Sequence, residues 1–117
     1  VLSAIAVPAY KSHTAKTEVS SAVMSVKALL VNIDQEIINK GSFPSALNTI
    51  GASEKMNAMG SLALDADAKT ITFKWVGENN SIPADQTVTY TKSESEGWSC
   101  ILSSGINADY QPKSCKS

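Results

Sequence analysis

The sequence lacks the features that usually point to nucleotide or nucleic-acid binding. It contains no arginine, and its ten lysines face eleven acidic residues, so the formal net charge is −1. A chain without a strong positive field has no electrostatic signature for nucleic acid or for anionic lipid. The sequence also has no glycine-rich phosphate loop, and its few aromatic residues are not interleaved with lysines.

Residues for metal binding and catalysis are equally scarce. His13 is the single imidazole, with no cysteine or second histidine at ligand spacing, so the sequence predicts no metal site and no cofactor. No serine stands in a G-x-S-x-G elbow. The acidic pairs Asp65/Asp67 and Glu94/Glu96 lack the partners that calcium binding or glycoside hydrolysis requires, and we interpret them as turn and edge charges. The sequence therefore predicts no catalytic residue and no enzyme.

Only two cysteines are present, Cys100 and Cys115, and both lie near the end of the chain. A pair separated by a polar, turn-rich stretch indicates a disulfide, which forms outside the cytoplasm. Two free buried thiols are the alternative, although the stretch between the cysteines makes a poor buried segment.

A long hydrophobic run is also missing. Residues 1–7 are apolar but stop at Pro8, far short of the roughly 20 residues that span a bilayer. No initiator methionine or basic segment precedes them. We interpret the run as the stump of a longer hydrophobic segment, with a buried first strand closed by Pro8 as the alternative.

The first third of the chain predicts a helix. Residues 12–40 contain no proline or glycine, and apolar residues recur there at steps of three and four. We assign residues 1–40 to this segment, with regular helix from roughly Tyr10 to Lys40 and a stop at Gly41 and Pro44. The apolar stripe covers an arc of about 80°, a narrow seam suited to packing on a sheet. The stripe consists of Val19, Val23, Val26, Leu30, Ile33 and Ile37.

A second line of small or mildly apolar residues lies on a helix face turned well away from this stripe. In a monomer it is an ordinary solvated face. In a polymer it is the face where a neighbouring helix approaches closely. Its members are Thr17, Ser21, Met24, Ala28 and Val31.

The rest of the chain predicts antiparallel strands. A connecting loop over residues 41–60, with a short helical turn near residues 53–57, precedes apolar residues that alternate with threonines and other polar residues. This alternation predicts four strands between residues 61 and 102, followed by a disulfide loop over residues 100–115. The expected fold is a single α+β domain over residues 1–117, with a long N-terminal helix packed on a four-stranded antiparallel sheet.

Both ends of the chain resemble type IV pilins. The opening VLSAIAVPAY resembles the end of the family's hydrophobic N-terminal segment, where an Ala/Ile run meets a proline and then an aromatic residue, and TAK at residues 14–16 resembles the family as well. GWSC at residues 97–100 and PKSCK at residues 112–116 resemble the borders of the C-terminal disulfide loop of type IVa pilins. In residue identity the resemblance is specific only at these two ends.

The resemblance implies an N-terminally truncated major pilin with a ladle-like pilin fold. Such a subunit forms a helical pilus filament for twitching motility, adhesion and DNA uptake, and is anchored in the inner membrane before assembly. The implied partners are identical subunits, the pilus assembly machinery, host or surface receptors and phage. Whether DNA is also a partner is left open by the resemblance. The family's cleavage site, methylated residue and key glutamate lie upstream of Val1 and match no residue here.

The resemblance adds two residues, Pro8 and Ser117, to the candidate functional residues, and it raises two alternative functions. Pro8 joins the assembly face as the point where a long helix bends or melts. Ser117 stands where a subset of similar pilins carries an O-linked glycan, with an unmodified, frayed terminus as the alternative. A minor pilin acting as adhesin or DNA receptor would need a basic stripe or extra loops. The disulfide loop argues against a type II secretion pseudopilin.

Overall fold

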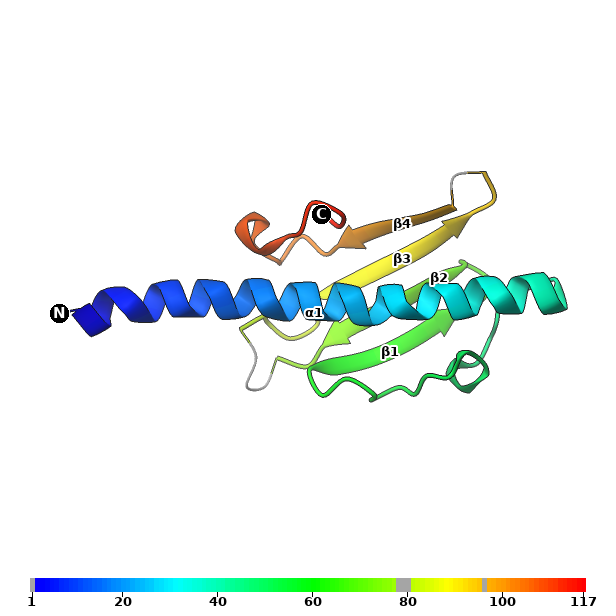
Figure 1. The fold of residues 1–117 in the computed structure, drawn as a ribbon, viewed down its shortest axis with the longest axis horizontal. Coiled ribbons are helices and arrows are strands. Elements are labelled where there is room, and N and C mark those ends of the chain that lie inside the picture. The colour runs from blue at the N-terminus through cyan, green and yellow to red at the C-terminus, as the bar shows by residue number, and fades with distance from the viewer. Residues whose placement is uncertain (1, 78–80, 96) are drawn as a thin grey trace.

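The computed structural model describes residues 2–77, 81–95 and 97–117, with side chains from Thr14 onward. The element order is α1 (Leu2–Lys40), η1 (Leu47–Ile50), β1 (Gly60–Asp65), β2 (Thr70–Trp75), β3 (Thr87–Ser93), β4 (Gly97–Leu102) and η2 (Ala108–Tyr110). Figure 1 shows α1 lying across one face of the sheet and running past it at the N-terminal end, in a molecule of 60 × 27 × 19 Å. The predicted α+β fold is confirmed.

The sheet is a plain antiparallel meander in the order β1-β2-β3-β4. Its register aligns one buried residue from each strand, so that Leu62 faces Phe73, Phe73 faces Val88 and Val88 faces Leu102. Because side chains alternate between the two faces of a strand, the threonines between these apolar residues point to the other face. The sheet therefore has one apolar face, and α1 covers it.

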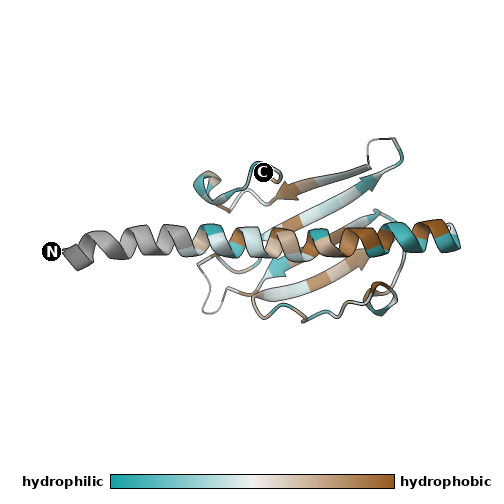
Figure 2. Cartoon of the chain, in the orientation of Figure 1, coloured by the Kyte–Doolittle hydropathy of each residue, from teal (hydrophilic) through white to brown (hydrophobic). Residues whose placement is uncertain are grey.

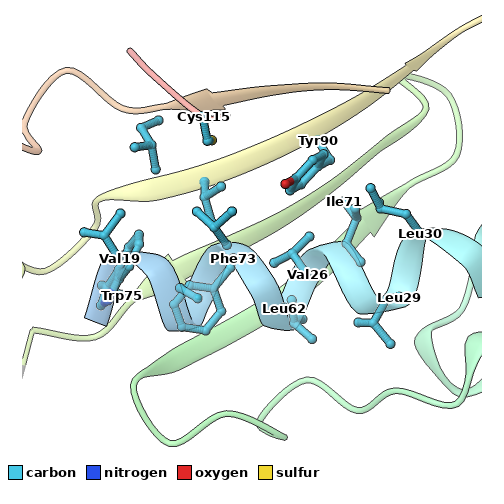
Figure 3. Packing of buried hydrophobic residues seen from close by; sticks show 14 of the residues in the cluster. Val19, Val26, Leu29, Leu30, Leu62, Ile71, Phe73, Trp75, Tyr90 and Cys115 are labelled. Carbon is cyan, nitrogen blue, oxygen red and sulfur yellow. The ribbon is translucent and has the colours of Figure 1, made fainter. Parts of the chain in front are cut away.

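The helix packs its apolar stripe onto this face. Val19, Val26 and Ile33 are fully buried, Val23 and Leu30 are nearly so, and Ile37 is partly buried. Figure 3 shows the helix side chains meeting Leu62, Ile71, Phe73, Trp75 and Tyr90 from the strands. Burial of this kind contributes about 1.5–3 kcal/mol for each large apolar side chain.

The buried face of α1 is wider than the narrow seam expected from the sequence. Ala15, Ala22 and Leu29 are buried as well, which widens the arc to about 120°. Beside Leu29 the segment after the helix returns along this flank: Asn32 Nδ2 donates to the carbonyl of Ile50 at 2.9 Å. The connecting loop thus acts as a second packing surface beside the sheet.

Both ends of α1 can be explained from local chemistry. The helix ends at Lys40 because Gly41 adopts a φ of 75° and donates its N–H to the carbonyl of Ile37 at 2.8 Å. In the described residues the helix reaches back to Leu2, well before Tyr10, and it continues through Pro8. Proline removes one main-chain donor locally, while the alanine and leucine residues before it favour helix. The side chains of Pro8 and His13 lie outside the described part of the chain.

The short helical turn expected near residues 53–57 is present only as a single turn, in which the N–H of Met56 donates to the carbonyl of Ser53 at 3.3 Å. A 3-10 helix occurs at Leu47–Ile50 and is closed by Gly51, whose φ is 77°. Ile50 is buried, so this 3-10 helix is held by packing against the core. Among the residues described here, no helix has both the length and the apolar character to cross a bilayer.

Candidate functional site

The helix face opposite the sheet carries an exposed line of apolar and small residues. The five residues predicted for this second face are all exposed, and Met24 and Val31 are 68% and 63% exposed. Figure 2 shows that the C-terminal half of α1 contains many apolar residues. We call this face the outer stripe; it comprises Thr17, Ser21, Met24, Ala28, Val31 and Ile38.

Ile38 was not predicted, although it is 74% exposed and continues the line. Met24, Val31 and Ile38 are separated by seven residues each, which is close to two helical turns, so they lie on one side of α1. This seven-residue spacing was visible in the sequence. The shorter steps of three and four were not continued to Ile38, because the polar Gln35 stands between Val31 and Ile38. Three large apolar side chains are therefore presented to solvent in one row.

The outer stripe is suited to helix packing and not to chemistry. Its small members, Ser21 and Ala28, stand between the larger ones, and the distance at which two helices pack depends on the side chains at their contact. Lys16 and Lys27 are exposed on one flank of the row. The stripe itself contains no ionisable side chain.

The C-terminal region is closed by the Cys100–Cys115 disulfide, with a Cα–Cα distance of 4.9 Å. Lys116 then forms a parallel bridge with Ile101, and its carbonyl accepts from the N–H of Leu102 at 3.3 Å. The tail thus lies beside β4 and covers part of that sheet edge. Closing a loop of this length contributes about 3 kcal/mol in the chain-entropy account.

The last residue is exposed but not frayed. The N–H of Ser117 donates to Gln111 Oε1 at 3.0 Å, and Gln111 Nε2 donates to Ser117 Oγ at 3.2 Å. The same nitrogen also donates to the carbonyl of Ile106 at 2.9 Å. Gln111 therefore fixes the terminal serine beside the disulfide.

A polar contact between helix and sheet was missed by the sequence reasoning. Asp34 Oδ1 accepts from Trp98 Nε1 at 3.1 Å and from Lys92 Nζ at 3.0 Å. Lys92 Nζ also lies 5.4 Å from the centroid of the Trp98 ring. The contact joins α1 to the end of the sheet.

The described residues contain no assembled chemical centre. No group of three or more His, Cys, Asp or Glu side chains among them is placed to hold a metal ion. Burial raises the pKa of Tyr90 above its ordinary value of 10.0. This phenol belongs to the core.

A long helix on an antiparallel meander, with one apolar face against the sheet, a second exposed, and a C-terminus closed by a disulfide, defines a pilin-type domain. The chain belongs to the pilin family: the family profile described as pilin (bacterial filament) matches residues 15–116. The resemblance inferred from the two chain ends is thereby confirmed, and the family is structural, not enzymatic.

Two proteins similar to this chain are a type IV major pilin and a fimbrial protein. The chain is 27% identical over 107 residues to the type IV major pilin protein PilE1 of Neisseria gonorrhoeae, covering 86% of this chain and 65% of that protein. It is 26% identical over 106 residues to a fimbrial protein of Neisseria meningitidis serogroup A / serotype 4A, covering 86% of this chain and 62% of the relative. The chain thus spans a little under two thirds of the length of both relatives.

Proposed function

We propose that this chain is the structural subunit of a type IV pilus, a filament displayed outside the cell. The single observation that carries the proposal is the outer stripe, because it presents a row of exposed apolar side chains on the helix face that the sheet leaves uncovered. The family match and the type IV major pilin among its relatives support the same assignment.

The geometry suits a repeated contact between unlike surfaces, which generates a helical polymer when the rotation does not close. The outer stripe of one subunit would pack on a neighbouring helix, with Met24, Val31 and Ile38 as the anchors. Each of these side chains contributes about 1.5–3 kcal/mol on full burial. Edge-to-edge pairing is a poorer route at β4, because the Lys116 bridge already covers part of that edge.

Several finer features belong to the same proposal. Pro8 and the N-terminal part of α1 are assigned to the filament interior, with the inner membrane as the site before assembly. The pilus assembly machinery, surface receptors and phage are the expected partners, and twitching motility, adhesion and DNA uptake the expected activities.

Deleting the gene tests the subunit role. Sheared surface material from cells with and without the gene would be compared by electron microscopy, with a complemented strain as control. Loss of filaments in the deletion strain and their return on complementation support the proposal. Intact filaments in the deletion strain would contradict it and point to a minor subunit.

We also propose that Ser117 accepts an O-linked glycan. Its side chain is exposed, and its position beside the disulfide is fixed by Gln111, so a modifying enzyme would meet an ordered, accessible hydroxyl. A glycan at this position adds bulk and hydration to the surface without touching the core, so its effect is expected on antibody or phage recognition and not on folding.

Mass spectrometry of the C-terminal peptide from native filaments checks this prediction. We expect a glycan mass addition that disappears in Ser117→Ala and persists in Ser114→Ala, which removes another exposed hydroxyl nearby. A parent peptide found only at its unmodified mass would refute the assignment.

A further inference from the structure

A cavity of about 610 Å³ lies where the end of α1 meets two hairpin turns of the sheet. Figure 1 shows the C-terminal end of α1 at the same end of the molecule as the β1–β2 and β3–β4 turns. The walls of the cavity include Ile37, Phe43, Lys69, Lys92 and Glu94. The volume falls within the range of small-molecule sites, roughly 300–1,000 Å³. No residue of the outer stripe lines it.

Two lysines line this cavity, Lys69 in the turn just before β2 and Lys92 on β3. The N–H of Lys92 donates to the carbonyl of Lys69 at 2.9 Å, directly beyond the paired residues Thr70 and Thr91. The two lysines are therefore neighbours, and each has a carboxylate partner, Glu94 for Lys69 and Asp34 for Lys92.

The two lysines differ in how firmly they are paired. Lys92 Nζ lies 3.0 Å from Asp34 Oδ1, in a pair that is partly buried. Lys69 Nζ lies 3.4 Å from Glu94 Oε1, and the Glu94 side chain is 93% exposed. Because exposed ion pairs contribute little stability, Lys69 can exchange Glu94 for another anion at small cost. Because Glu94 stays on the cavity wall, the exchange replaces one carboxylate at Lys69 by another, which suits a ligand with a single carboxylate.

The opposite wall is apolar and aromatic. Phe43 packs at a tilt against Trp98 with ring centroids 6.2 Å apart, and Ile37 lines the same cavity. Ser42 and Ser93 also line the cavity. A ligand that fits this wall must have an apolar face as well as its single negative charge and its hydrogen-bonding groups.

We propose that this cavity binds a sugar ring bearing a carboxylate, as in a uronic acid. The C–H face of the ring packs on Phe43, the carboxylate accepts from Lys69 with Lys92 as the second cation, and the ring hydroxyls reach the serines. A polyphosphate or nucleic acid fits less well, because Asp34 and Glu94 leave the site without a strong positive field. The inference goes beyond filament assembly, and its test does not depend on that proposal.

Amide chemical-shift titration of the whole chain, labelled with ¹⁵N, tests the binding. We expect glucuronic acid at neutral pH to shift the amides of Ser42, Lys69, Glu94 and Gly97, with glucose and acetate binding at least about tenfold more weakly. Equal binding of glucose would contradict the role of the carboxylate. Equal binding of acetate would leave only an anion site, and the absence of shifts at these amides would reject the cavity as a binding site.

Matched variants distinguish binding in the cavity from a general effect of the protein's charge. Lys69→Gln should weaken glucuronic acid binding about tenfold, since it removes a charge-assisted hydrogen bond. Glu94→Gln should strengthen it, because Lys69 loses its competing partner. Lys74→Gln makes the same charge change at an exposed lysine that pairs with Asp85 and should leave binding unchanged. Equal loss in Lys69→Gln and Lys74→Gln would overturn the proposal.

Discussion

Replacing Leu30 with aspartate is expected to unfold the domain. Leu30 is 7% exposed and lies among Ile71, Tyr90 and the other core residues (Figure 3). The change removes a buried side chain, at a cost of about 2–5 kcal/mol, and adds a buried charge without a partner, which costs several kcal/mol more. The sum is comparable with the whole stability of a small domain, roughly 5–15 kcal/mol.

Thermal unfolding followed by circular dichroism measures this effect. The control is Val31→Asp, the same kind of change one residue further on, where the parent side chain is 63% exposed. We expect a cooperative melt close to that of the parent for Val31→Asp, and for Leu30→Asp either no cooperative transition or one lowered by at least about 20 °C. A Leu30→Asp curve that matches the parent would show that this side of α1 does not face the sheet.

Replacing Ala28 with glutamate should abolish filaments and leave the domain folded. Ala28 is exposed and lies on the outer stripe between Met24 and Val31. Glutamate favours helix almost as well as alanine does, so α1 is expected to persist. In the filament, however, the new carboxylate would be buried between apolar anchors without a partner, at a cost of several kcal/mol for every subunit contact.

The readouts are pilus counts by electron microscopy and the melting curve of the isolated chain. Ala108→Glu is the matched control, because it introduces the same side chain at an exposed alanine in η2; it should leave both filaments and melting temperature unchanged. Normal piliation in Ala28→Glu would count against the outer stripe as the subunit contact.

Much of the fold is readable from local patterns in the sequence. The steps of three and four along α1 define a helix with an apolar face, and the alternation in TITFKW and TVTYT defines strands with one apolar face each. Complementary faces of one helix and one sheet leave few ways to pack them. The fold class therefore follows from periodicity alone.

The parts that were missed depend on long-range contacts. The burial on the Leu29 flank of α1 depends on the returning loop at Ile50, and nothing local to Leu29 reports it. Asp34 and Trp98 are 64 residues apart in the chain, so their hydrogen bond exists only once helix and sheet have packed. The cavity likewise needs the end of α1 and two separate turns to meet.

Methionine oxidation compares the outer stripe directly in the free chain and in the filament. Met24 is 68% exposed and lies on the stripe, whereas Met56 is 52% exposed and lies off the helix, so each molecule carries its own reference. Dilute peroxide converts exposed methionine to the sulfoxide, and peptide mass spectrometry gives the rate at each site. The account predicts that both methionines oxidise readily in the free chain and that filaments protect Met24 strongly relative to Met56. Equal oxidation of Met24 in the free chain and in filaments would contradict the proposal that subunits meet through this face.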